Sequence, residues 1–231
     1  MVPPSGLDAT VLVRAWSLEP PAAAMVADVY VKICGLTEPE HVAAAVEAGA
    51  DAVGFVMTRS PRQITPERAA ELVSLVPGHV LTVGVFRGED PGAVRAAALT
   101  SGVRALQLHG RHPHSDFTAL KDLGAVLLRA VDAEADLRCG AFDEDLLLVD
   151  APHAGSGLPW DWAAIRGRPS GRWLLAGGLT PANVTEAVAA AGPWGVDVSS
   201  GVESAPGVKD PALIKAFLET VRGAHPGSGS A

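Results

Sequence analysis

The sequence predicts one α/β domain folded as a closed (β/α)8 barrel, and three observations lead to this prediction. Short apolar, β-branched runs alternate with longer Ala-rich segments that carry charge at helical spacing. The alternation repeats about every 20–25 residues, and it occurs eight times in the 231-residue chain. Near-continuous apolar strands joined by crossover helices are typical of a parallel sheet with covered faces.

Each predicted strand is a short run rich in Val, Ile, Leu, Ala or Phe. The runs cover residues 29–34, 52–56, 81–86, 105–108, 126–130, 146–150, 173–176 and 195–199. A doubly wound open sheet is the alternative, because it also uses βα repeats. No dinucleotide-binding glycine fingerprint follows the first strand, so we favour the closed barrel.

A helical segment is expected after every strand. The segments lie near 38–48, 66–76, 91–101, 115–123, 133–139, 161–166, 181–191 and 210–222. Several begin with a proline or an acidic residue in the first turn, a pattern typical of helix N-termini. The βα units fill residues 28–223 and leave little room for a second domain.

The two ends of the chain lack these patterns. We expect residues 1–27 to form a flexible extension, within which Met25 is an alternative start. The Gly/Ser-rich residues 224–231 are expected to form a disordered tail.

Composition narrows the classes of function. With a formal net charge of −8, the chain lacks the basic surface of a general nucleic-acid or anionic-membrane binder. No stretch reaches the roughly 18 apolar residues of a membrane span. Two cysteines are too few for a disulfide framework, so we expect a reducing, cytoplasmic location. The helical segments show no long apolar seam, so a monomer is expected.

In such barrels the chemistry lies where strands end and βα loops begin. The first strand ends with Lys32, Ile33 and Cys34, and alternation places Lys32 and Cys34 on one face. A thiol there, with a usual pKa of about 8.5, is a plausible proton acceptor, and Lys32 is a cation that favours its thiolate. The alternative is a small buried hydrophobe, the interpretation that we give to Cys139.

The sixth strand is apolar until it ends in Asp150. A partly buried carboxyl there has a raised pKa and is able to deliver a proton, although it is also able merely to cap the loop. Strands one and six lie on different sides of an eight-stranded mouth. Cys34 and Asp150 are therefore predicted to act on different atoms of one small molecule.

Glycine and serine gather after the last three strands, in GSG at 155–157, AGGLT at 176–180 and DVSSG at 197–201. Singly, each is an ordinary turn. Together they place backbone amides on the adjacent loops where many barrels bind phosphate. The predicted phosphate site comprises Gly157, Gly177, Gly178, Ser200 and Gly201.

Two further features follow strands two and four. Arg62 in SPR at 60–62 is either a solvated loop residue or a bidentate partner for a substrate carboxylate. His109, His112 and His114 have a spacing that suggests a metal, but no acidic or cysteine ligand accompanies them. We expect no metal and assign this cluster no role.

Several motifs, in order along residues 29–221, make the chain resemble the phosphoribosylanthranilate isomerase family of tryptophan biosynthesis. They are KICGLT at 32–37, GADAVGF at 49–55, SPR at 60–62, VGVF at 83–86, QLHG at 107–110, the Asp150 strand, DW at 161–162, AGGL at 176–179 and GVDVSSGVE at 195–203.

This resemblance implies an Amadori rearrangement of N-(5-phosphoribosyl)anthranilate to 1-(2-carboxyphenylamino)-1-deoxyribulose 5-phosphate, without cofactor or metal. Asp150 would be the general acid at the furanose oxygen, and Cys34 the base at C2. Arg62 would hold the anthranilate carboxylate, and Asp197 would lie near the sugar hydroxyls. The chain departs from the family at Leu158, where relatives have Lys after the Gly-Thr-Gly loop.

Two rival functions remain. The first is the histidine-pathway sugar isomerase, which performs the same rearrangement on a related barrel. Enzymes of that family resemble one another in having an aspartate as the base on the first strand, where this chain has Cys34. A non-catalytic module that binds a phosphate ligand is the second rival.

Overall fold

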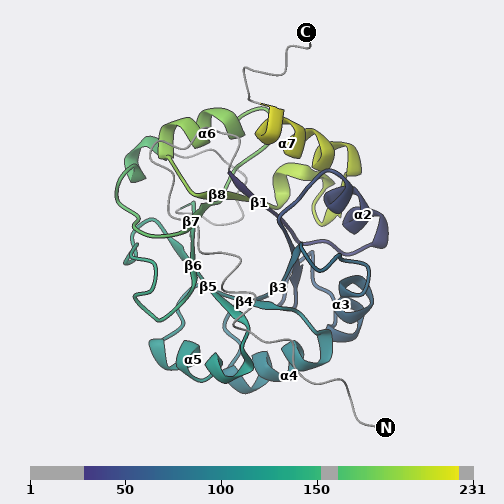
Figure 1. Cartoon of the computed structure of the whole chain (residues 1–231), viewed down its shortest axis with the longest axis vertical. Helices are drawn as coiled ribbons and strands as arrows, with labels where there is room; N and C mark the ends of the chain where they lie inside the picture. Colours follow the sequence, from purple (N-terminus) through teal and green to yellow (C-terminus); the bar gives the residue numbers. More distant parts are fainter. Residues whose placement is uncertain (1–28, 152–160, 224–231) are drawn as a thin grey trace.

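The computed structural model describes residues 29–151 and 161–223. Eight parallel strands close into a barrel in sequence order, with β8 paired to β1 (Figure 1). The predicted fold class is confirmed. The strands are β1 (Tyr30–Cys34), β2 (Ala52–Val56), β3 (Leu81–Phe86), β4 (Ala105–His109), β5 (Val126–Asp132), β6 (Leu146–Asp150), β7 (Trp173–Leu175) and β8 (Gly195–Val198).

Helices surround the barrel in Figure 1. Asp90 caps the helix Pro91–Ser101 by accepting hydrogen bonds from Gly92 N and Ala93 N, and Thr65 caps the helix Pro66–Val73 through Arg68 N. Of the helices in the described ranges, four begin with proline, as the sequence predicts. The helices are α2 (Pro39–Glu47), α3 (Pro66–Val73), α4 (Pro91–Ser101), α5 (His114–Thr118), α6 (Val184–Ala191) and α7 (Pro211–Gly223).

Two cores hold the barrel together. Alternate strand residues point outward to the helices, as Ile33 and Val53 do, and form the larger core. The others point inward and fill the barrel with small and medium side chains such as Val83, Leu128 and Leu148. The inward row on β1 brings Lys32 and Cys34 into the barrel, and Cys34 lies at the end of that row.

The helix expected at 133–139 is wrong. These residues form turns, and Arg138 makes an isolated bridge with Ser170. The Arg129 guanidinium donates to the carbonyl oxygens of Asp136 and Arg138, at 2.9 and 3.0 Å. Asp132 also accepts from Glu134 N. These long-range and local bonds replace helical ones, so tertiary contacts override the helical pattern.

Other boundaries also differ from the prediction. Residues 115–123 divide into the short α5 and a 3-10 turn, η2 (Lys121–Leu123), while 161–166 contains only the 3-10 turn η3 (Trp162–Ile165). After β8 the chain forms a 3-10 turn, η4 (Ser200–Val202), and then an unpredicted antiparallel hairpin. Its strands are β9 (Glu203–Ala205) and β10 (Val208–Lys209).

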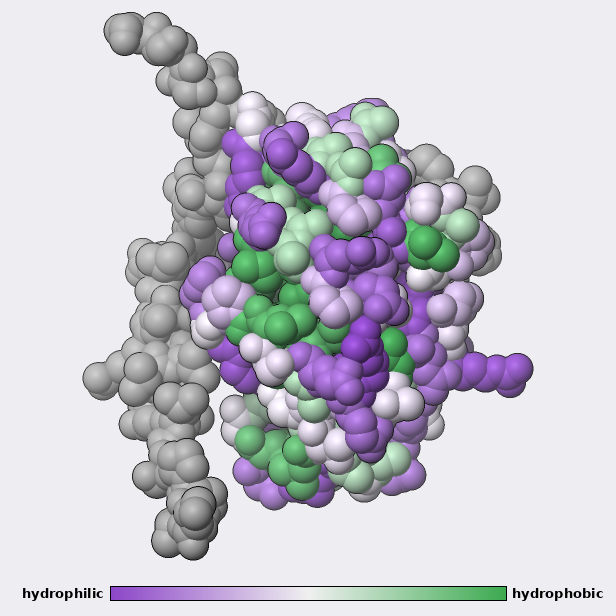
Figure 2. All heavy atoms as spheres, turned by 90° about the vertical axis from the view of Figure 1, so that its right-hand side faces the viewer, coloured by the Kyte–Doolittle hydropathy of each residue, from purple (hydrophilic) through white to green (hydrophobic). Residues whose placement is uncertain are grey.

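The outer surface mixes hydrophilic and apolar side chains on the face shown in Figure 2. Within the described residues, the large apolar side chains that are clearly exposed are Leu75, Leu99 and Val208, from three separate parts of the chain. No helix in the described ranges is both long and apolar enough to cross a membrane. The expected extension at 1–27, with Met25, and the tail at 224–231 lie outside the described residues.

Candidate active site

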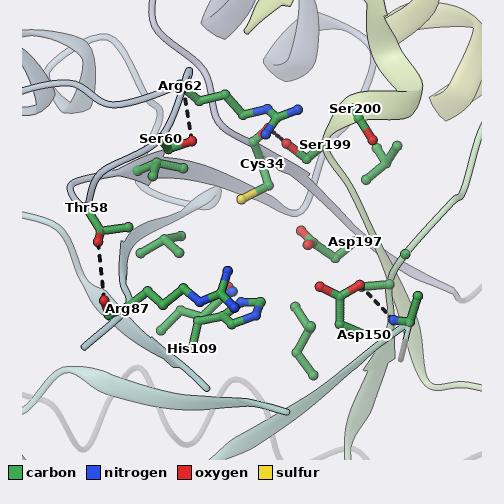
Figure 3. Close-up of a pocket in the computed structure, with 18 of the residues that line it drawn as sticks. Cys34, Thr58, Ser60, Arg62, Arg87, His109, Asp150, Asp197, Ser199 and Ser200 are labelled. Atoms are coloured by element: carbon green, nitrogen blue, oxygen red, sulfur yellow. Dashed lines mark hydrogen bonds between the residues drawn. The ribbon is translucent and has the colours of Figure 1, made fainter. Parts of the chain in front are cut away.

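A pocket opens at the carboxyl ends of the barrel strands (Figure 3). Cys34 reaches it from β1 and Asp150 from β6, so strands that are distant in sequence bring the predicted base and acid to one cavity. Of the other predicted site residues, the structure places Arg62, Gly177, Gly178, Asp197 and Ser200 in its lining. Gly201 lies outside the lining, and Gly157 falls outside the described residues.

The Cys34 thiol lines this pocket and is buried, with 5% of the residue exposed. Gly54 on β2 makes room for it, because a Cβ there would lie 2.9 Å from Sγ. Burial raises the pKa of Cys34, and the positive charge of Lys32 acts in the opposite direction. The expected effect of Lys32 is therefore present, but burial outweighs it.

Lys32 is fully buried and forms an ion pair with Asp197, with 2.7 Å between Nζ and Oδ1. Burial alone lowers the pKa of this ammonium, yet Asp197 and Cys34 together raise it above its usual value. Lys32 therefore carries a permanent positive charge beside the thiol. Asp197 keeps 8% exposure and faces the pocket, so it is available to a ligand as well as to Lys32.

Asp150 ends β6 with its carboxyl group facing the pocket (Figure 3). Its Oδ1 accepts a hydrogen bond from Ala151 N at 2.8 Å. Burial, together with the Asp197 charge, raises the pKa of Asp150 to about 6, although that hydrogen bond acts in the opposite direction. The raised pKa matches the sequence prediction and suits a group that donates a proton near neutral pH.

The loops after β7 and β8 lie against each other. Gly177 and Gly178 adopt φ angles of 84° and 69°, a left-handed conformation that favours glycine. At Gly201 a Cβ would overlap the carbonyl oxygen of Leu179, so glycine allows the two backbones to approach. Gly201 thus shapes the predicted phosphate site without lining the pocket.

Gly201→Ala is expected to weaken substrate binding, because the methyl group forces the two loops apart. We expect KM to rise about tenfold and the free energy of unfolding to fall by about 1–3 kcal/mol. Steady-state kinetics and urea unfolding measure these effects. Gly78→Ala is the control, since a Cβ there meets nothing within 4 Å and should leave KM unchanged. An unchanged KM in Gly201→Ala would contradict the assignment of these loops.

Arg62 lines the pocket but is already paired. Its Nε and Nη2 donate to the Glu203 carboxylate at 2.6 and 2.8 Å, and this hydrogen bonding raises the pKa of Arg62. The expectation for Arg62, a solvated loop residue or a bidentate partner for a substrate carboxylate, does not include its ion pair with Glu203. The only signal was the last residue of the GVDVSSGVE motif, which lies 141 residues away.

His109 was also missed, because its spacing grouped it with His112 and His114. In the structure His112 pairs with Asp116, and His114 with Asp143, whereas His109 faces the pocket. Burial and the Arg87 charge lower the pKa of His109 to about 4, so the ring is neutral. The position of His109 at the end of β4 was the available signal.

Gln107 and Arg87 complete the pocket wall next to His109. Gln107 is 3% exposed, and its Oε1 has no hydrogen-bond partner. Arg87 is exposed, and within the described ranges no carboxylate forms an ion pair with its guanidinium. In those ranges, no three metal-ligating side chains gather closely enough to hold a metal ion.

These features define a (β/α)8-barrel enzyme with an acid and a thiol at one pocket beside glycine-rich loops. The family model described as N-(5'phosphoribosyl)anthranilate (PRA) isomerase matches residues 31–220. The chain belongs to this family, the isomerases of tryptophan biosynthesis.

This chain aligns with known members of the family over nearly their whole length. The N-(5'-phosphoribosyl)anthranilate isomerase of Paramagnetospirillum magneticum is 44% identical, with 86% of this chain and 99% of the relative covered. The crystal structure of TrpF from Jonesia denitrificans is 48% identical, with a TM-score of 0.78 and coverage of 85% and 98%. A phosphoribosyl anthranilate isomerase in complex with reduced 1-(o-carboxyphenylamino)-1-deoxyribulose 5-phosphate is 37% identical, with a TM-score of 0.74 and coverage of 84% and 99%.

Proposed function

We propose that this chain converts N-(5'-phosphoribosyl)anthranilate into 1-(2-carboxyphenylamino)-1-deoxyribulose 5-phosphate by general acid–base catalysis, with Asp150 as acid and Cys34 as base. The observation that carries the proposal is the placement of a raised-pKa carboxyl and a buried thiol at one pocket. The relative whose structure holds the reduced product supports the same substrate class.

In the first step, Asp150 gives its proton to the furanose oxygen while the bond between C1 and that oxygen breaks. The nitrogen lone pair forms the C1–N double bond of an iminium ion, and Asp150 is left as a carboxylate. This acid acts on an oxygen whose basicity rises as the bond breaks. A pKa of about 6 leaves enough neutral acid near neutrality to begin the reaction.

In the second step, the Cys34 thiolate removes the proton from C2. The electrons of the C–H bond form a C1–C2 double bond, and those of the iminium return to nitrogen, giving an enolamine. The enolamine takes up a proton at C1 and loses one from the C2 hydroxyl, which yields the ketone. No net oxidation occurs, so the acid–base pair suffices.

The remaining roles follow the pocket geometry. We infer that Gly177, Gly178 and Ser200 hold the phosphate together with Gly201, which keeps their loops close. Asp197 lies between Lys32 and the pocket, where it meets the sugar hydroxyls. Arg62 binds the anthranilate carboxylate. The predicted contributions of Gly157 and Leu158 lie outside the described residues.

The direct test of this function mixes purified protein with N-(5'-phosphoribosyl)anthranilate and follows the loss of its anthranilate-type fluorescence. We expect loss far above the uncatalysed rate. A rate equal to the uncatalysed one would favour the phosphate-binding module. Because the mechanism needs a free thiol, we propose a reducing, cytoplasmic location as well. The monomeric state stays a prediction, which analytical ultracentrifugation tests.

The pH dependence of kcat/KM is expected to be bell-shaped. Below about pH 6 both Asp150 and Cys34 are protonated, so no base is present. Above the raised pKa of Cys34 both are ionised, so no acid is present. The working form, with neutral Asp150 and ionised Cys34, is a minor form of the singly protonated enzyme between these limits.

Initial rates from about pH 5 to about pH 10 measure this profile. In Asp150→Asn the limb near pH 6 should vanish, and the residual rate should rise only as Cys34 ionises. Persistence of that limb in the variant would assign it to another group.

A further inference from the structure

The pairing of Arg62 with Glu203 decides which side of the guanidinium is available to a ligand. The Arg62 side chain is 20% exposed and that of Glu203 only 4%. Glu203 occupies Nε and Nη2, which form the side edge of the planar guanidinium. Glu203 uses two of the five N–H donors. The end edge, formed by Nη1 and Nη2, still has one N–H on each nitrogen and is able to bind a second carboxylate.

The Glu203 carboxylate also accepts hydrogen bonds from two other residues of the hairpin formed by β9 and β10. Lys209 Nζ donates to its Oε1 at 2.7 Å, and Gly207 N donates to its Oε2 at 3.1 Å. Lys209 is 2% exposed and therefore fixed. One carboxylate thus lies between two cations. Burial alone raises the pKa of Glu203, but the bonds to Arg62 and Lys209 hold it at about 2.

The hairpin also touches the loop that carries Arg62. Gly207 has a φ of 83°, and a Cβ at this position would lie 2.6 Å from the carbonyl oxygen of Pro61. The close approach of Gly207 to Pro61 brings the residue before Arg62 against the hairpin. The hairpin of β9 and β10 therefore contacts the chain next to Arg62 through Gly207 and binds the Arg62 guanidinium through Glu203.

The same hairpin reaches the catalytic strand. Lys209 Nζ donates to the Ser199 carbonyl oxygen at 2.8 Å, and Ser199 Oγ donates to the Cys34 carbonyl oxygen at 3.1 Å. Figure 3 shows Arg62, Ser199 and Cys34 on the same side of the pocket. The network therefore fixes Arg62 relative to the base.

We propose that Glu203 is a positioning residue for the carboxylate subsite, because it directs the Nη1–Nη2 edge of Arg62 toward the aromatic carboxylate of the substrate. This inference rests on the proposed function, in which that carboxylate binds Arg62. Without Glu203 the guanidinium loses its side-edge partner, and its charge is free to turn toward other anions in the pocket.

Two ligands separate this role from a merely structural one. The first is the reduced product analogue, and the second is its counterpart made from aniline, which lacks the aromatic carboxylate. In Glu203→Gln we expect the first ligand to bind about tenfold more weakly and the second to change by less than about twofold. KM for the substrate should rise by a similar factor while kcat stays within about threefold of wild type.

A double-mutant cycle makes the test sharper. If Glu203 acts through Arg62, Glu203→Gln should cause no further loss of analogue affinity in the Arg62→Ala background. Glu203→Asp keeps the charge between the two cations and so protects the fold. Its carboxylate is one methylene shorter, so it should weaken only the carboxylate-bearing ligand, by less than Glu203→Gln does.

Glu144→Gln is the matched control. Glu144 is 4% exposed and pairs with Arg129 at 2.7 Å, but neither residue lines the pocket. It should lower stability and leave both affinities unchanged. Equal weakening of both ligands by Glu203→Gln, or an added loss in the Arg62→Ala background, would overturn the inference. A wild-type protein that binds the analogue but does not turn over substrate would instead overturn the proposed function.

Discussion

Replacing Cys34 with alanine is expected to lower kcat by at least about a hundredfold, because the variant lacks the group that removes the C2 proton. Neither charged group next to the thiol is expected to take its place, because Lys32 is a cation and Asp197 is paired with it. Stopped-flow or steady-state fluorescence with N-(5'-phosphoribosyl)anthranilate measures the loss.

Binding should survive in this variant. Alanine removes only the sulfur from the end of β1, so the affinity for the reduced product analogue is expected to stay within about threefold of wild type. Cys34→Ser keeps nearly the same volume but lacks a thiolate, and it should be as inactive as Cys34→Ala. Cys139→Ala is the control, since Cys139 lies outside the pocket lining and its loss should leave kcat unchanged. A Cys34→Ala variant with a kcat near that of wild type would exclude the thiol as the base.

Asp150→Asn is the second variant for which we expect a loss of at least about a hundredfold in kcat, since the asparagine amide is too weak an acid to protonate the furanose oxygen. The amide oxygen is still able to accept the hydrogen bond from Ala151 N, so the loop keeps its local contact. Asp132→Asn is the matched control. Asp132 ends the neighbouring strand β5 in register with Asp150, but it is exposed and outside the pocket lining.

The same substitution is expected to stabilise the protein at alkaline pH. Folding raises the pKa of Asp150 from 3.8 to about 6. Its contribution to stability is therefore present at low pH and is lost as pH rises through about 6, where the buried carboxyl ionises. Asp150→Asn removes that loss, so its gain in unfolding free energy should reach at most about 3 kcal/mol near pH 8. The gain should shrink from pH 6 toward pH 4.

Urea unfolding of wild type and Asp150→Asn at several pH values measures this difference. Lower activity together with higher stability at pH 8 is the expected pair of results. A variant that is less stable than wild type at pH 8 would show that burial of the ionised Asp150 carboxylate does not destabilise the folded state.

The strand pattern was readable from the sequence because barrel strands are continuous apolar runs, and their ends are marked by the first polar residue. Asp150 follows this rule, and the structure brings it to one pocket with Cys34 and Asp197, which lie at or next to the ends of β1 and β8. The segment at 133–139 shows the limit of such patterns. Its alternation of Ala and acidic residues suits a helix, but the guanidinium of Arg129 binds its carbonyl oxygens instead.

Charge pairing was the feature that sequence patterns misjudged most. Arg62 has the position of a free ligand-binding cation, yet it meets Glu203 through a hairpin that the apolar periodicity does not reveal. His109 belongs by spacing with His112 and His114, yet it faces the pocket while the other two pair with Asp116 and Asp143. Burial and the Arg87 charge lower its pKa and keep it neutral. Glu203 lies 141 residues from Arg62, so no local pattern contains this pair.

Periodicity and turn chemistry act between neighbouring residues, and for this reason the linear order of residues specifies the eight strands, most helix starts and the residue types at the strand ends. The raised pKa of Asp150, the Lys32–Asp197 ion pair and the side of Arg62 left for a ligand depend on distances between segments up to 165 residues apart. Only closure of the barrel sets those distances, because desolvation and Coulomb interactions depend on what surrounds a group in space.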